Sequence, residues 1–86
     1  MVGNIDQHLG QRLAEARQSS GVSATAAAEA IEKSGLEYAA IERGEVRIRA
    51  IFLARLGRLF GRPVSWFYRG LPGQEVFEKA TGAKLV

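Results

Sequence analysis

The feature that most constrains the fold of this chain is a series of short segments in which apolar residues recur at helical spacing, each closed by a glycine. The first apolar face consists of Ile5, Leu9, Leu13 and Ala16. Gly21 follows it, which predicts a helix from about Asp6 to Ser19. The sequence shows no strand-like alternation, internal repeat or low-complexity linker. The pattern therefore predicts an all-α fold, a compact bundle with short connections.

Two further helices are expected in "ATAAAEAIEK" and "LEYAAIER". Ser23 is a favourable N-cap for the first, whose alanines let another helix approach closely. A turn near Lys33 to Gly35 separates the two segments. In the second, Tyr38 and Ile41 lie three residues apart on the side expected to face the core, and Gly44 ends the helix.

The segment "AIFLARLGRLFG" has the strongest helical pattern. Its apolar face consists of Phe52, Leu53, Leu56, Leu59 and Phe60. Gly61 ends this helix, and Ser65 can cap a fifth, aromatic helix, "WFYRG". We thus expect five helices within residues 5–71. The side chains expected to be mainly buried are Leu13, Ala28, Ile31, Ile41, Leu53, Leu56, Phe60 and Trp66.

The chain divides into a domain of residues 1–71 and a C-terminal tail of residues 72–86. In the tail, Val76, Phe77 and Ala80 lie at helical spacing, which indicates either a short sixth helix or a frayed end. A short helix with an exposed aromatic residue needs another surface to cover it. The tail is therefore a candidate dimerisation element that buries Val76 and Phe77 against a second subunit.

Composition excludes several classes of protein. The 86 residues, 47% of them hydrophobic, suffice for one small core. The absence of cysteine excludes disulfides and favours a reducing cytoplasm, and no apolar run approaches the roughly 20 residues that span a bilayer. His8 is the only histidine, and the carboxylates are scattered. We expect a soluble cytoplasmic protein, not an enzyme, with no metal, cofactor or membrane partner.

The charges are distributed unevenly along the chain. Residues 1–42 carry three basic and six acidic side chains, a net charge of −3, whereas residues 43–69 carry seven arginines and one glutamate, a net charge of +6. Arginine favours bidentate contact with phosphate or carboxylate. Arg55, Arg58 and Arg62 form a stripe along the fourth helix that suits an acidic partner or nonspecific DNA contact. A solvated face that only covers the core remains the alternative.

Four stretches carry a resemblance to a known family: "GQRLAEAR", "SGVS", "AIERGEVR" and "LARLGRLFGRPVSWFYRG". Their order and spacing resemble the lambda-repressor-like helix-turn-helix domains of Cro/cI-type (XRE) transcriptional regulators. The resemblance implies that the second and third helices form the helix-turn-helix, with the third helix in the major groove of DNA. It also implies a tightly packed small residue at Ala28.

The resemblance assigns roles to individual residues. Arg17 and Glu42 match an ion pair that joins the first helix to the end of the third. Phosphate contacts in the family come from the start of the second helix and from the loop after the third, which here are Ser23, Ala24, Arg43, Arg47 and Arg49. Ala24 departs from the family pattern, because the glutamine common at this position can bond a phosphate and alanine cannot.

Base-reading positions of the family correspond to Ser34, Gly35, Leu36, Glu37 and Ala40. Relatives usually carry longer polar side chains at several of them, which match the donors and acceptors of base edges. Here Glu37 could accept from a cytosine amino group and Leu36 could pack on a thymine methyl. In the preceding turn, Glu32 replaces the usual left-handed glycine, and Gly35 is expected to supply that conformation, lengthening the second helix and shortening the third.

Two functions fit these observations. One is a DNA-binding transcriptional regulator that binds double-stranded DNA and is then associated with the nucleoid. It is expected to be a dimer, so that the weak binding to each of two half-sites is combined. The other is a degenerate helix-turn-helix protein that acts through a protein partner, as a co-regulator, anti-regulator or antitoxin-like protein, with weak or no sequence-specific DNA binding.

Overall fold

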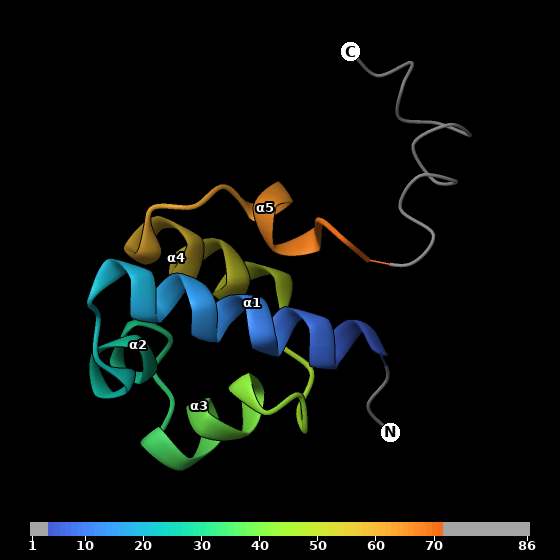
Figure 1. Ribbon diagram of the computed structural model, residues 1–86. Coiled ribbons are helices and arrows are strands. Elements are labelled where there is room, and N and C mark those ends of the chain that lie inside the picture. The colour runs from blue at the N-terminus through green and yellow to red at the C-terminus, as the bar shows by residue number, and fades with distance from the viewer. Residues whose placement is uncertain (1–3, 72–86) are drawn as a thin grey trace.

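The structure, a computed structural model, describes residues 4–71, and these residues form five helices and no strand (Figure 1). The helices are α1 (Asn4–Ser20), α2 (Ala24–Ala30), α3 (Gly35–Glu42), α4 (Ala50–Phe60) and α5 (Val64–Tyr68). The expected all-α, five-helix architecture is confirmed. The possible sixth helix and the proposed dimer contacts of Val76 and Phe77 lie outside the described residues. Within residues 4–71, none of the helices has the length and apolar character needed to cross a membrane.

The long helix α1 lies at the centre of the bundle, with α2 and α3 on one side and α4 and α5 on the other (Figure 1). Gly10 allows α3 to approach closely. A Cβ atom at this position would lie 2.5 Å from the carbonyl oxygen of Glu42 and 2.6 Å from that of Ile41. Because backbone atoms cannot move aside cheaply, any larger residue at Gly10 would displace the end of α3.

The core is formed by one face of each helix. Leu13 of α1, Leu56 of α4 and Tyr38 of α3 are completely buried. The other buried apolar residues are Leu9, Ala16, Ala27, Ala28, Ile31, Ile41, Ile48, Leu53, Phe60 and Phe67. Burying one large aliphatic or aromatic side chain contributes about 1.5–3 kcal/mol, so this cluster supplies the main stabilisation of the fold.

The helix ends follow local rules. Ser23 caps α2, since its hydroxyl accepts a hydrogen bond from the N–H of Ala26 at 3.0 Å. Gly61 ends α4 in the left-handed conformation, with φ of 74°. At α5 the expectation is wrong: Pro63 occupies the N-cap position and Ser65 lies inside the helix. The fixed φ of proline suits this position without a side-chain cap.

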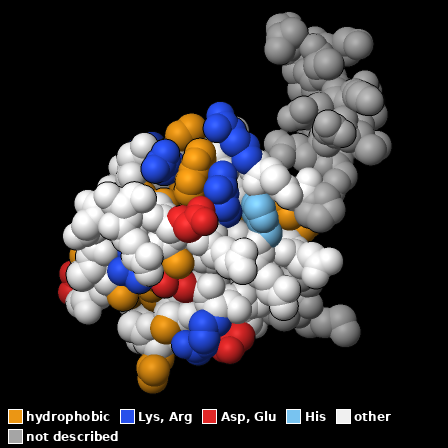
Figure 2. Space-filling view, in the orientation of Figure 1, with side chains coloured by type: hydrophobic (Ala, Val, Ile, Leu, Met, Phe, Trp, Pro, Cys, Tyr) orange, Lys and Arg blue, Asp and Glu red, His pale blue; other side chains and the backbone are white. Residues whose placement is uncertain are grey.

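The aromatic residue of α5 that fills the core is Phe67, which is completely buried, and not Trp66, which is only half-buried. Trp66 lies between two guanidinium groups, with Arg12 at 3.9 Å and Arg62 at 4.6 Å from the ring centroid. Arg12 also donates to the carbonyl oxygen of Trp66 at 2.9 Å. Trp66 therefore joins α1 to α5. On the face of the molecule drawn in Figure 2, basic and hydrophobic side chains lie side by side.

Two residues expected on apolar faces are exposed. Ile5 is 51% exposed and Leu59 is 40% exposed. Ile5 lies in the first turn of α1, and on α4 the next residue after Leu59, Phe60, is buried. The apolar faces of α1 and α4 are thus wider than the surface that neighbouring helices cover.

Candidate nucleic-acid interface

The turn between α2 and α3 places Glu32 in the left-handed region. Its φ is 58°, which is uncommon for a residue other than glycine, and the N–H of Lys33 closes the turn by donating to the carbonyl oxygen of Ala28 at 2.9 Å. Gly35 does not adopt a positive φ. The expectation that Gly35 replaces the left-handed residue and that α2 becomes longer is therefore wrong, because Ser34 already caps α3 and Gly35 is its first residue.

The first turn of α3 is closed by a reciprocal capping box between Ser34 and Glu37. The hydroxyl of Ser34 accepts from the N–H of Glu37 at 3.1 Å, and Oε1 of Glu37 accepts from the N–H of Ser34 at 2.9 Å. The backbone bond from Ser34, followed by the hydroxyl contact, lowers the pKa of Glu37 below its usual value. The carboxylate is thus an anion folded back on the helix end. The S-x-x-E spacing is a sequence signal for this cap.

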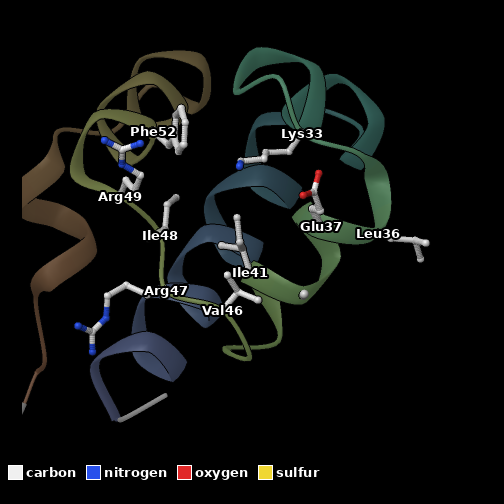
Figure 3. A pocket seen from close by; sticks show the side chains of 10 residues that line it. Lys33, Leu36, Glu37, Ile41, Val46, Arg47, Ile48, Arg49 and Phe52 are labelled. Atoms are coloured by element: carbon white, nitrogen blue, oxygen red, sulfur yellow. The ribbon is translucent and has the colours of Figure 1, made fainter. Parts of the chain in front are cut away.

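The remaining exposed face of α3 is apolar. Leu36 is 84% exposed and projects outward from the helix (Figure 3). Gly35 has nothing within 4 Å of the position that a Cβ would take, and Ala40 is half-buried. The two side chains of this group that could hydrogen-bond a base, Ser34 and Glu37, are both engaged in the capping box. The α3 face therefore offers Leu36 as its only large projecting side chain.

Two of the three expected phosphate-binding arginines already have a carboxylate partner. Arg43, at the C-cap of α3, contacts both oxygens of Glu45, at 3.0 and 3.1 Å, and this bond lowers the pKa of Glu45. Arg47 contacts both oxygens of Asp6, at 3.1 and 3.4 Å. Both arginine side chains are more than half exposed, whereas the Asp6 side chain is almost fully buried. Arg47 therefore neutralises a buried charge at the start of α1.

A pocket of about 370 Å³ lies between α3, the loop that follows it and the start of α4 (Figure 3). It is lined by Lys33, Leu36, Glu37, Ala40, Ile41, Val46, Arg47, Ile48, Arg49 and Phe52. The floor is apolar, and the charged side chains stand at its edge. The pocket brings together five residues assigned from the family resemblance, namely Leu36, Glu37, Ala40, Arg47 and Arg49.

Three cations surround the half-buried ring of Phe52 at one side of this pocket. Lys33 Nζ lies 5.5 Å from the ring centroid, and the guanidinium carbons of Arg49 and Arg55 each lie at 5.8 Å. We call Lys33, Arg49, Arg55 and Phe52 the Phe52 cluster. Lys33 was expected only in a turn and Phe52 only on the apolar face of the fourth helix, so neither was a predicted site residue. A signal was present in the spacing of Arg49, Phe52 and Arg55, each three residues apart on one helical face.

The two remaining assigned phosphate positions, Ser23 and Ala24, lie at the start of α2 and are exposed, and neither lines the pocket. Arg17 and Glu42 lie behind the interface, and two hydrogen bonds of 2.6 and 3.3 Å join them. Arg17 also donates to the carbonyl oxygen of Val22 at 3.3 Å. This pair holds α1, the end of α3 and the segment before α2 together.

Among residues 4–71, no group of three or more potential metal ligands occurs.

An exposed helix held by a preceding capped helix and a tight turn defines the class of protein: a helix-turn-helix protein, the architecture of DNA-binding transcriptional regulators. Residues 8–66 match the family described as "Helix-turn-helix domain". The chain belongs to this family. No curated protein matches the chain at a significant level.

Two crystal structures of the clp gene regulator ClgR from Corynebacterium glutamicum are similar to this chain. One has a TM-score of 0.69 and 25% identity, and the match covers 78% of this chain and 86% of that chain. The other has a TM-score of 0.75 and 22% identity, and the match covers 99% of this chain and 90% of that chain. At 22% identity, the similarity to the second structure shows a shared fold only.

Proposed function

We propose that this protein is a Cro/cI-type DNA-binding transcriptional regulator that places α3 in the major groove of double-stranded DNA. The observation that carries the proposal is the exposed face of α3 beside a loop with three arginines, within a chain of the helix-turn-helix family. ClgR, which is similar over most of its length, is described as a gene regulator. The net charge of +6 over residues 43–69 favours association with a polyanion.

The three loop arginines are not equivalent anchors in this proposal. Arg43 must exchange Glu45 for a phosphate, and Arg47 must leave the buried carboxylate of Asp6. Each exchange offsets part of the gain from the new contact. Arg49 contacts the Phe52 ring and has no ion-pair partner within residues 4–71. Arg49 is thus the strongest phosphate contact of the three.

Sequence readout by α3 is proposed to rest on apolar contact. Ser34 and Glu37 are engaged with each other, so they are poorly placed to bond base edges without opening the capping box. Leu36 projects from the helix, and the only apolar group that a base pair presents in the major groove is the thymine methyl. Apolar contact by Leu36 discriminates between base pairs less than a bidentate hydrogen-bonding side chain does. Sequence-dependent DNA shape contributes further to the specificity.

Because a single α3 discriminates weakly between DNA sequences, we propose that the regulator acts as a homodimer on two half-sites. The tail, residues 72–86, is the proposed dimerisation element. Removing residues 74–86 should leave a folded but more monomeric domain, because all five described helices lie before this segment. Sedimentation of the full and shortened chains tests this point. An unchanged mass would place the dimer contact elsewhere.

The function is tested by measuring the affinity of the full chain for random duplex DNA and for a duplex selected from a random-sequence library, over a range of salt concentrations. We expect a steep decrease of affinity with salt for both duplexes and tighter binding of the selected one. A steep decrease with equal affinities would indicate binding to the backbone alone. Absence of binding at low salt would contradict the proposal.

One observation favours a second function. Leu36, at 84% exposure, and the apolar floor of the pocket form a surface that could equally receive an apolar segment of a protein. In that case the protein is a degenerate helix-turn-helix member that binds a regulator or an acidic partner. Binding of a protein that Leu36→Ala weakens, together with no affinity for DNA, would favour this function.

A further inference from the structure

The loop between α3 and α4 is tied to the first turn of α1. The carboxylate of Asp6 accepts hydrogen bonds from Nε and Nη2 of Arg47, at 3.1 and 3.4 Å. The backbone of Gly44 lies against the next residue of α1, since a Cβ atom at Gly44 would lie 2.6 Å from Cα of Gln7. Ile48, near the end of the loop, is buried. The loop is therefore held near its start and near its end.

The two partners of the Arg47–Asp6 pair differ in their exposure to water. The side chain of Arg47 is 72% exposed, whereas that of Asp6 is 1% exposed. If Arg47 leaves, its guanidinium is solvated but the carboxylate is not. Taking one partner from a buried ion pair costs roughly 100-fold or more in an equilibrium constant, whereas one charge-assisted contact contributes about ten-fold. The exchange of Asp6 for a phosphate is therefore unfavourable for Arg47.

Arg43, in the same loop, does not meet this obstacle. Its partner is Glu45, and the two side chains are 56% and 58% exposed. Because water reaches both groups when this pair opens, the exchange of Glu45 for a phosphate costs little. The two arginines therefore have carboxylate partners of different kinds, one at the surface and one in the interior.

We propose that Arg47 is a positioning residue, which stays on Asp6 in the DNA complex and holds the loop so that Arg49 reaches the DNA backbone. The inference rests on the proposed function and gives Arg47 a part in it other than a phosphate contact. The guanidinium of Arg47 points away from α3 (Figure 3). Arg49 follows the buried Ile48 and is the N-cap residue of α4, so the position of its backbone depends on the loop.

The contacts of Arg49 depend on the same placement, because it belongs to the Phe52 cluster through its position beside the ring. Asp6 lies on α1, a helix that does not enter the groove in the proposed complex. Its carboxylate therefore supports DNA affinity indirectly, although it has the same sign of charge as DNA.

The experiment measures affinity for one duplex as a function of salt for the full chain, Arg47→Ala, Asp6→Asn and the double variant Asp6→Asn/Arg47→Ala. The double variant removes a neutral pair, so the net charge is unchanged. If Arg47 positions the loop, this variant should bind about three- to ten-fold more weakly, with the slope of log affinity against log salt unchanged. Loss of a phosphate contact would lower that slope by about one unit, and Arg49→Ala is the comparison that should show this decrease.

Asp6→Asn gives a second test, in which the two roles of Arg47 predict opposite signs. The variant frees Arg47 and raises the net charge by one, so a phosphate-binding Arg47 would make it bind DNA more tightly. A positioning Arg47 loses its hold on the loop, and binding should weaken by about three- to ten-fold. Glu45→Gln is the matched control, because it frees Arg43 with the same change of charge and should tighten binding.

Melting temperatures of all variants are recorded, so that affinities are compared where each variant is folded. If Arg47→Ala alone does not fold, the double variant still gives the slope, because it removes the buried carboxylate together with the guanidinium. A slope lowered by about one unit in the double variant, or tighter binding by Asp6→Asn, would overturn the inference.

Lower melting temperatures with the affinity and slope of the parent would also overturn it, since the pair would then only stabilise the fold, and the proposed function would stand. If the parent binds no duplex, the proposed function itself fails, and the inference with it.

Discussion

Arg17 of α1 holds Glu42 at the last turn of α3 through two parallel hydrogen bonds, of 2.6 Å from Nε and 3.3 Å from Nη2. Both side chains are largely buried, at 18% and 16% exposure. A planar guanidinium on a planar carboxylate fixes orientation as well as distance. Since Gly10 brings the backbone of α1 onto the same end of α3, these two contacts set the position of the exposed helix relative to the bundle.

Arg17→Lys should lower the free energy of unfolding by about 1–3 kcal/mol, because a lysine keeps the charge but cannot form both hydrogen bonds. Urea denaturation measures the change. Arg58→Lys, at an exposed position of α4, is the control and should change stability by less than about 0.5 kcal/mol. Equal effects of the two changes would mean that the bidentate geometry adds nothing.

Leu56→Ala should cost about 2–5 kcal/mol, because Leu56 is completely buried in the core and the change leaves a cavity. Leu59→Ala is the comparison on the same helix. Leu59 is 40% exposed, and its truncation should cost less than about 1 kcal/mol. Thermal or urea unfolding of the two variants separates them, and similar losses would show that the assigned core face of α4 is wrong.

Tyr38 should make the protein sensitive to alkaline pH. Burial, and next the contact with Glu42, raises the pKa of the Tyr38 phenol above its usual value of 10.0. The unfolded chain therefore loses this proton first as pH rises above 10, and the folded state loses stability from there up to the raised pKa, by about 1.4 kcal/mol per pH unit. Below that window the phenol is neutral in both states and contributes no pH dependence.

Tyr38→Phe should remove this part of the alkaline loss while leaving the protein folded at neutral pH, since phenylalanine fills most of the same volume. Unfolding free energies measured at several pH values above and below 10 give the test. If the variant loses stability with pH as steeply as the parent, then Tyr38 is not the group responsible.

Several helix ends that depend on short-range rules were predictable, although the cap of α5 was not. Ser23 as an N-cap and Gly61 as a helix stop follow from the sequence neighbours alone, and both are confirmed. The choice of Phe67 over Trp66 was missed, because one residue of register decides which ring enters the core, and packing against neighbouring helices sets that register. Glu32 adopts the left-handed conformation for a similar reason, since the closed turn imposes it.

The sequence predicted some of the residues that line the pocket, but not the ion pairs of the arginines beside it. The family resemblance assigned Leu36, Ala40 and Arg49, which line one pocket. The pairing of Arg47 with Asp6 joins residues 41 positions apart and leaves no local pattern in the sequence. The capping box of Ser34 and Glu37 did have a pattern, yet its consequence, that both polar side chains are engaged, depends on the side-chain geometry.

The DNA sequence preference that Leu36 provides should depend on contact with thymine methyl groups. In the duplex selected from a random-sequence library, replacing the thymines under α3 by uracil removes only the methyl and keeps the base pairing. We expect the parent to bind the uracil duplex about four-fold more weakly for each contacted methyl. Leu36→Ala should bind both duplexes equally. A parent that does not distinguish them, or a selected site without thymine, would contradict apolar readout.

The most direct test of the central claim, that α3 enters the major groove, is the affinity of Glu37→Gln for the selected and random duplexes. Glutamine can keep the capping box with Ser34, and it removes an anion whose lowered pKa keeps it charged at neutral pH. If α3 enters the groove, every duplex should bind more tightly, by roughly two- to five-fold, the factor for about 0.5–1 kcal/mol of surface electrostatics. Unchanged or weaker binding of all duplexes, with the melting temperature preserved, would contradict it.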